Sequence, residues 1–102
     1  PGAAPRAGSR QKNSLTHMKT ETMKTRCLII DDEKLARDLL REYIEAYPEI
    51  DIVGECAKGN EAVEKINELK PDLIFLDVQM PGMTGFDVLD EIEHEPYVIF
   101  TT

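Results

Sequence analysis

Residues 27–33 read CLIIDDE, so that four apolar residues run directly into three consecutive carboxylates. Residues 73–77 read LIFLD and repeat the pattern with a single acid. Short apolar and β-branched runs of this kind indicate strands that are buried on both faces, as in parallel sheets. Adjacent like charges repel, so acids gathered at the ends of buried strands call for a chemical explanation.

Strand-like and helix-like patterns alternate from Thr25 to the end of the chain. Pro48 and Pro71 end the first two helical patterns. We expect strands at 26–30, 50–56, 72–76 and 97–101, and helices at 34–47, 61–69 and 84–93. The order β-α-β-α-β-α-β predicts an α/β fold, a doubly wound parallel sheet with helices on both faces, truncated after the fourth strand.

Two apolar surfaces stand out in this pattern. The helix at 34–47 carries apolar residues at helical spacing, with a second apolar row beside them: Leu35, Leu39, Tyr43 and Tyr47, then Ala36, Leu40 and Ile44. The last strand has no following helix to cover it and should form an apolar edge, which invites pairing with another chain. We therefore expect a homodimer, with exchange of elements between copies as one route to closure.

Composition limits the classes of function. The 102 residues carry a net charge of -8, with 41% hydrophobic and 31% charged residues, which suits one domain with a core. Arg6, Arg10, Lys12 and Lys19 lie in 1–22, so residues 23–102 are more acidic than the whole chain. An acidic body is a poor binder of nucleic acid. Apolar runs of about four residues are far below the ~20 of a membrane span, and we expect a cytoplasmic protein without a membrane partner.

Residues 1–22 are rich in Pro, Gly, Ser and basic residues. We expect them to be a flexible expression-tag or linker segment, which leaves 23–102 as the domain. A disulfide between Cys27 and Cys56 is possible on count alone. Two reduced, partly buried thiols in a cytosolic protein are the simpler interpretation.

The acids that end the first and third strands point to a metal site. If these strands are neighbours at the ~4.8 Å spacing of paired strands, Asp31, Asp32 and Asp77 converge on one small volume. Mg²⁺ would relieve their repulsion, because it prefers carboxylate, water and phosphate oxygens. Taken singly, these acids could merely start a helix or a turn. Their joint pattern favours a Mg²⁺ site that handles a phosphoryl group.

The segment 78–85, VQMPGMTG, links the third strand to its helix. Pro81 and Gly82 favour a turn, and Thr84 with Asp87 resembles a capping box that starts the helix. Such a loop would keep Asp77 exposed and present a backbone carbonyl near the metal. Thr101 and Thr102 end the last strand, where a hydroxyl could donate a hydrogen bond to a phosphoryl oxygen.

Three stretches together resemble the receiver domain of two-component response regulators: LIIDDE at 28–33, LIFLDVQMPGMTG at 73–85 and VIFTT at 98–102. The amino-acid sequences of these stretches are also similar to those of the subfamily that carries a LytTR-type DNA-binding output domain. The resemblance implies a flavodoxin-like fold for 23–102 that lacks the last helix, strand and helix of the family. It also implies that DNA is bound only through an output domain outside this chain.

The resemblance assigns roles to matched positions. Asp77 would be the phosphoacceptor for a sensor histidine kinase. Asp32 would bind Mg²⁺ directly and Asp31 directly or through water, while Gln79 would offer its backbone carbonyl. Thr102 would follow the phosphoryl group and couple it to conformational change.

The family also uses a Lys at the end of a fifth strand, and no Lys of this chain takes that position; Lys58 and Lys70 are expected to be solvated. We expect a signalling domain and not an enzyme. Two alternatives stay open. One is an inert, self-associating fragment. The other is a Mg²⁺-dependent phosphohydrolase with an aspartate nucleophile, but Gln79 stands where such enzymes place their second acid.

Overall fold

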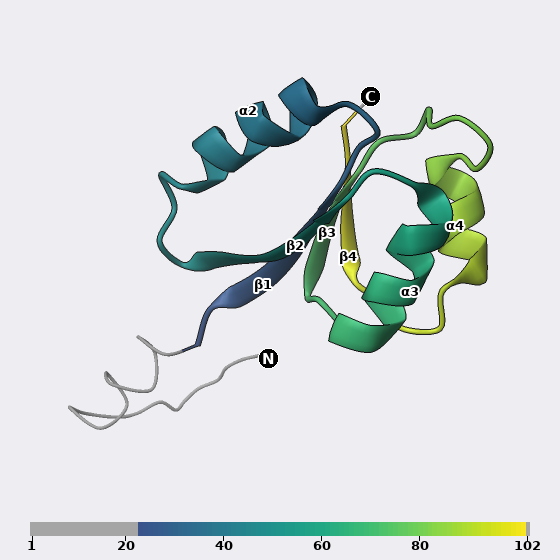
Figure 1. Ribbon diagram of the computed structural model, residues 1–102. Coiled ribbons are helices and arrows are strands. Elements are labelled where there is room, and N and C mark those ends of the chain that lie inside the picture. Colours follow the sequence, from purple (N-terminus) through teal and green to yellow (C-terminus); the bar gives the residue numbers. More distant parts are fainter. Residues whose placement is uncertain (1–22, 102) are drawn as a thin grey trace.

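The computed structural model describes residues 23–101, so the predictions for 1–22 and for Thr102 lie outside the described residues. Four parallel strands form one sheet in the order β2-β1-β3-β4. The strands are β1 (Thr25–Ile30), β2 (Ile50–Cys56), β3 (Leu73–Leu76) and β4 (Tyr97–Phe100), and the helices are α2 (Lys34–Ile44), α3 (Gly59–Leu69) and α4 (Gly85–Glu91). The predicted doubly wound α/β fold is confirmed (Figure 1).

Helices cover the two faces of the sheet unequally. Helix α2 lies on one face, whereas α3 and α4 pack side by side on the other (Figure 1). We call these the α2 face and the α3 face. The chain leaves β1 toward β2 on one side and returns to β3 on the other, so strand order reverses between β1 and β3. Ligands of doubly wound sheets bind at the carboxyl ends of the strands at this reversal.

The α3 face holds the larger core. Alternate residues of the strands meet apolar residues of α3 and α4, as period-two alternation requires. The buried members are Leu28, Ile30, Cys56, Ala62, Ile66, Ile74, Leu76, Met80 and Val88. Ala62 and Ile66 lie on the predicted apolar face of α3 and are fully buried.

The α2 face holds a smaller cluster. Its buried members are Cys27, Ile29 and Ile44, with Leu40, Ile52 and Phe75 among the partly buried residues packed against them. Both cysteines are free and buried, Cys27 on this face and Cys56 on the other. Burial is the main cause that raises the pKa of the Cys27 thiol to about 11 and that of Cys56 to about 12.

An irregularity in β2 changes the faces on which its side chains lie. Cys27 pairs with Ile52, but Leu28 pairs with Gly54, so Val53 is an extra residue in the ladder. Such a bulge reverses the inward and outward alternation beyond it. Ile52 therefore lies on the α2 face with Cys27, while Glu55 returns to that face with Ile29.

Element ends differ from the predicted bounds by a few residues. Helix α2 ends at Ile44 and not at Tyr47, because the amides of Ala46 and Tyr47 donate to Tyr43 and Ile44 in tighter turns. Helix α3 starts two residues earlier than expected, at Gly59. Helix α4 is shorter than 84–93, with Thr84 as its N-cap.

Several apolar residues stay exposed on the α2 face and at the β4 edge. The α2 residues Leu35, Leu39 and Tyr43 are 83%, 52% and 65% exposed, so only the Leu40 and Ile44 row of the predicted stripe packs on the sheet. Strand β4 pairs with β3 alone among the described strands. Its Tyr97, Ile99 and Phe100 are also exposed, as expected for an uncovered edge. No helix among residues 23–101 is long and apolar enough to cross a membrane.

Candidate functional site

Three carboxylates meet where β1 and β3 end. Because these strands are paired in parallel, with Ile30 opposite Leu76, the residues that follow them lie side by side. One carboxylate oxygen each from Asp31, Asp32 and Asp77 lies within 4.8 Å of the other two. Asp31 and Asp77 are buried, and Asp32 is more exposed, so the prediction that the loop keeps Asp77 exposed is wrong. We call these three residues the acidic site.

The two buried aspartates are held in the same way. The Oδ1 atom of Asp31 accepts the amide of Glu33 at 2.9 Å, and Oδ1 of Asp77 accepts the amide of Gln79 at 3.1 Å. These are Asx turns, in which a side chain bonds the backbone two residues on. In both residues one oxygen is thereby fixed, and Oδ2 remains for another partner.

Electrostatics in the acidic site are unfavourable without a cation. Burial raises the pKa of Asp77, and the charges of Asp31 and Asp32 raise it further, while the Gln79 amide acts in the opposite direction. Three carboxylates with free oxygens in one small volume are a donor set of the kind that Mg²⁺ prefers. The residues present therefore fit a divalent cation.

The loop after β3 approaches the acidic site closely. A Cβ atom on Gly85 would lie 2.6 Å from the backbone oxygen of Asp77, so only glycine fits there. The predicted capping box is confirmed, because Thr84 Oγ1 accepts the Asp87 amide at 3.2 Å and Asp87 Oδ2 accepts the Thr84 amide at 3.0 Å. Gly82 adopts φ +83° in the turn.

A hollow of about 750 Å³ opens beside the acidic site. Its polar end is formed by the three aspartates, Glu33, Gln79 and Thr101, and its apolar end by α2 and Phe100. The Oγ1 atom of Thr101 is buried and has no hydrogen-bond partner among the described residues. Asp32 and Lys58 line a second hollow, whereas Lys70 caps α3 and donates to Asn67.

The sequence interpretation missed two residues next to the acidic site. Arg37 Nη1 donates to the backbone oxygen of Asp31 at 2.8 Å, and Arg37 Nε bonds Glu55 Oε1 at 3.1 Å. The helical spacing of Arg37 with Leu40 and Ile44 could have indicated that this Arg faces the sheet. Glu55 gave no local signal, because the bulge decides its face.

The fold and the acidic site define a class of protein: a doubly wound α/β domain with a carboxylate cluster at its strand reversal. Comparison with known families gives the particular assignment. The profile of the response regulator receiver domain matches residues 27–102. The chain therefore belongs to the response regulator receiver domain family.

Relatives agree with this assignment. The transcriptional regulatory protein BtsR of Salmonella typhi is 46% identical over 77 residues, which are 74% of this chain and 32% of that protein. The Escherichia coli BtsR is 43% identical over the same length. The chain thus spans about a third of the length of these curated relatives.

Solved structures resemble the fold. The response regulator domain of Thermotoga maritima CheB matches with a TM-score of 0.70 and 39% identity, covering 76% of this chain and 59% of that one. The receiver domain of a Luxo repressor protein from Vibrio parahaemolyticus matches with a TM-score of 0.68 and 34% identity, covering 76% and 60%.

Proposed function

We propose that the domain is a phosphoacceptor, which receives a phosphoryl group on Asp77 from a sensor histidine kinase. The observation that carries the proposal is the position of Asp77 at the strand reversal, beside Asp31 and Asp32. A buried nucleophile next to two further acids suits phosphoryl transfer, in which positioning and charge stabilisation supply most of the catalysis. Family membership favours this function over that of a phosphohydrolase.

The geometry of Asp77 supports its role as nucleophile. Its Oδ1 is fixed by the Gln79 amide, so Oδ2 would attack phosphorus. The new P–O bond forms as the P–N bond to the kinase histidine breaks, and the electron pair of that bond stays on the imidazole. Asp32 would hold Mg²⁺ directly, Asp31 directly or through water, and Gln79 through its backbone carbonyl. Bound Mg²⁺ would offset the charge of the transferring group.

The end of β4 would sense the phosphoryl group. Thr102 is the proposed switch hydroxyl, and it follows Thr101, whose amide is fixed to the Leu76 oxygen at 2.9 Å. That bond ties the end of β4 to the end of β3, next to Asp77. In the whole protein, we propose, the cytoplasmic domain controls a DNA-binding output domain of the LytTR type.

A phosphoryl mimic tests the proposal. We expect beryllofluoride with Mg²⁺ to bind this chain, measured by ¹⁹F NMR, and the Asp77→Asn variant to lose the bound signal entirely. Asp90→Asn is the matched control, because it removes an equal charge from an exposed position of α4. Undiminished binding by the Asp77→Asn variant would contradict the assignment.

Self-association through β4 is a second proposal. One edge of β4 pairs with β3, and its Tyr97, Ile99 and Phe100 side chains are exposed. Two copies could pair these identical edges about a two-fold axis and thereby cover Tyr97 and Ile99. We propose a homodimer formed in this way, with exchange of elements as an alternative arrangement.

A further inference from the structure

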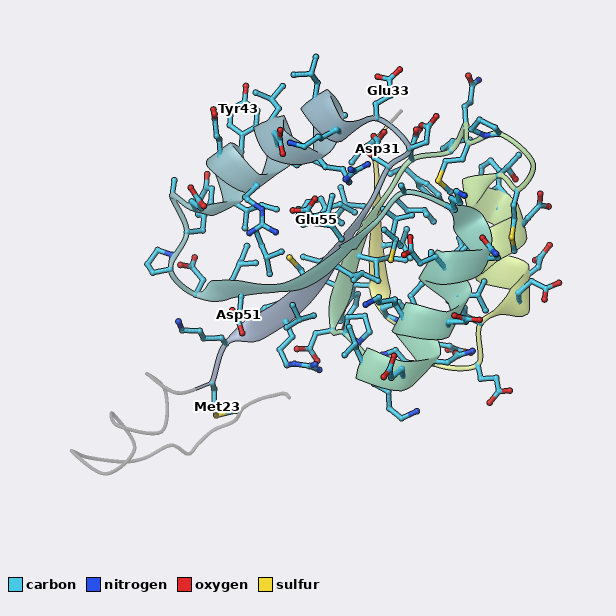
Figure 2. The ribbon with its side chains drawn as sticks, viewed as in Figure 1. Met23, Asp31, Glu33, Tyr43, Asp51 and Glu55 are labelled. Atoms are coloured by element: carbon cyan, nitrogen blue, oxygen red, sulfur yellow. The ribbon has the colours of Figure 1, made fainter. Side chains whose placement is uncertain are left out.

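One glutamate holds two arginines between α2 and the sheet. Glu55 Oε1 accepts Nε of Arg37 at 3.1 Å, and Oε2 accepts Nε of Arg41 at 2.7 Å as well as its Nη2. The Glu55 side chain is 25% exposed and that of Arg37 is 16% exposed. Figure 2 shows Glu55 between α2 and the sheet, and Asp31 near the end of β1.

Arg37 joins this ion pair to the acidic site. Its Nε bonds Glu55 while its Nη1 donates to the backbone oxygen of Asp31 at 2.8 Å. Only the planar guanidinium can reach two such acceptors in fixed directions. Arg41 bonds the same carboxylate and makes no hydrogen bond to Asp31 among the described residues.

The bulge in β2 places Glu55 where Arg37 can use it. If β2 paired regularly, with no bulge at Val53, alternation from Ile52 would turn Glu55 toward the α3 face. With it, Glu55 faces α2 and lies beside Ile29, two residues before Asp31. Bulges often redirect a side chain next to a functional site.

The carbonyl that Arg37 holds is the start of the peptide from Asp31 to Asp32. Fixing this oxygen fixes the plane of that peptide, and with it the direction in which the Asp32 backbone leaves the strand. Asp31 is also fixed by its own amide, which donates to the Cys56 oxygen at 3.0 Å, and by the Glu33 amide on its side chain. Among residues 23–101 the Asp32 side chain accepts no backbone amide, although it contacts the Asp77 side chain, so the peptide that Arg37 holds sets the position from which Asp32 extends.

We infer that Arg37 is a positioning residue for the acidic site, held in place by Glu55, and that it orients Asp31 and Asp32 for a divalent cation. The inference rests on the proposed function of the site. Arg37 would touch neither the cation nor the phosphoryl group. It acts on backbone geometry, as outer partners of metal ligands commonly do.

A charge effect of Arg37 and a positioning role of Arg37 predict opposite changes in Mg²⁺ affinity. As a positive charge near three carboxylates, Arg37 should weaken the binding of Mg²⁺, and its removal should tighten binding. As a positioning residue, it should strengthen binding, and its loss should weaken it. Mg²⁺ affinity therefore separates the two roles by sign.

The test is a Mg²⁺ titration by calorimetry on the full chain and on four variants, with a thermal melt of each. Arg37→Gln and Arg37→Lys should each lower Mg²⁺ affinity about tenfold, although lysine keeps the charge. Arg41→Gln, which removes the same charge from the same Glu55, should stay within about twofold of the unmodified chain. Asp32→Asn, which removes a proposed ligand, should abolish binding.

Each outcome bears on one proposal. Tighter binding by Arg37→Gln, with Arg37→Lys unchanged, would overturn positioning and leave a charge effect. A lower melting temperature of both Arg37 variants with unchanged Mg²⁺ affinity would also overturn it, as a purely structural role. Absence of Mg²⁺ binding by the unmodified chain would instead contradict the proposed function, and it is distinguishable because it precedes any variant.

Discussion

The two faces of the sheet share the same strands but are built differently. On the α3 face, nine buried residues form one cluster beneath two helices, whereas the α2 face buries three beneath one helix. The α2 face also holds the ion pairs of Glu55 and leaves Ile99 and Tyr97 exposed. The acidic site lies at the ends of the strands, where the two faces meet.

The two faces therefore differ in how much they contribute to folding stability and in how well they tolerate substitution. Apolar burial is the main favourable term in folding, so most of the stabilisation should come from the α3 face. A partly solvated Glu between two Arg is tolerated more easily on the α2 face, where water can still screen the charges. Exposed residues on the α2 face can be changed at small cost, and Arg37 on the same face contacts the acidic site.

Truncating one leucine on each face should give the largest expected difference in folding stability between the faces. Leu28→Ala empties space in the core of the α3 face, where Leu28 is fully buried, and should lower the free energy of unfolding by about 3 kcal/mol. Leu40→Ala, on the row of α2 that packs on the sheet, should lower it by only about 1 kcal/mol, because Leu40 is partly buried. Urea unfolding followed by circular dichroism measures both. Equal losses would mean that the two faces stabilise the fold alike.

The second-largest effect should concern association through the exposed edge of β4. We expect the chain to form dimers in size-exclusion chromatography with light scattering, and Ile99→Lys to weaken association about tenfold, or about 1.4 kcal/mol. Lysine at Ile99 would place a charge on the apolar side of the edge. Leu35→Lys is the control, since Leu35 lies on α2 and is already 83% exposed. A monomer at all concentrations would contradict the proposed pairing.

The smallest expected effect concerns the acidic site itself. Asp77→Asn should raise the free energy of unfolding at neutral pH by roughly 1 kcal/mol, because it removes a buried charge repelled by its neighbours. The pKa of folded Asp77 is raised, so the penalty of its charge is present above that pKa and fades as the pH falls through it. The advantage of the variant should vanish below pH 3.8, the ordinary pKa of the group.

Thermal melts from pH 3 to pH 8 measure this effect, with and without Mg²⁺. Added Mg²⁺ should stabilise the unmodified chain more than the variant, because it binds the folded acidic site. A variant less stable than the unmodified chain at pH 7 would show that Asp77 contributes more through its hydrogen bonds than it costs through its charge.

The sequence predicted what depends on local pattern. Alternating apolar runs located all four strands, and their terminal acids located Asp31 and Asp77, because parallel strands place their ends at one edge. The pattern of α2 could not tell which apolar row would be buried, since Leu35 and Leu40 are equally apolar. The face of Glu55 depends on a one-residue bulge, and that is a property of strand pairing that no local pattern carries.

The two cysteines allow the opening rate of each face of the sheet to be measured. With pKa values of about 11 and 12 and complete burial, neither thiol presents a thiolate to a reagent while its face is closed. Cys27 can be alkylated only when the α2 face opens, and Cys56 only when the α3 face opens. Each face of the sheet thus carries one buried cysteine. The ratio of the alkylation rates of Cys27 and Cys56 reports whether the molecule opens as one unit or face by face.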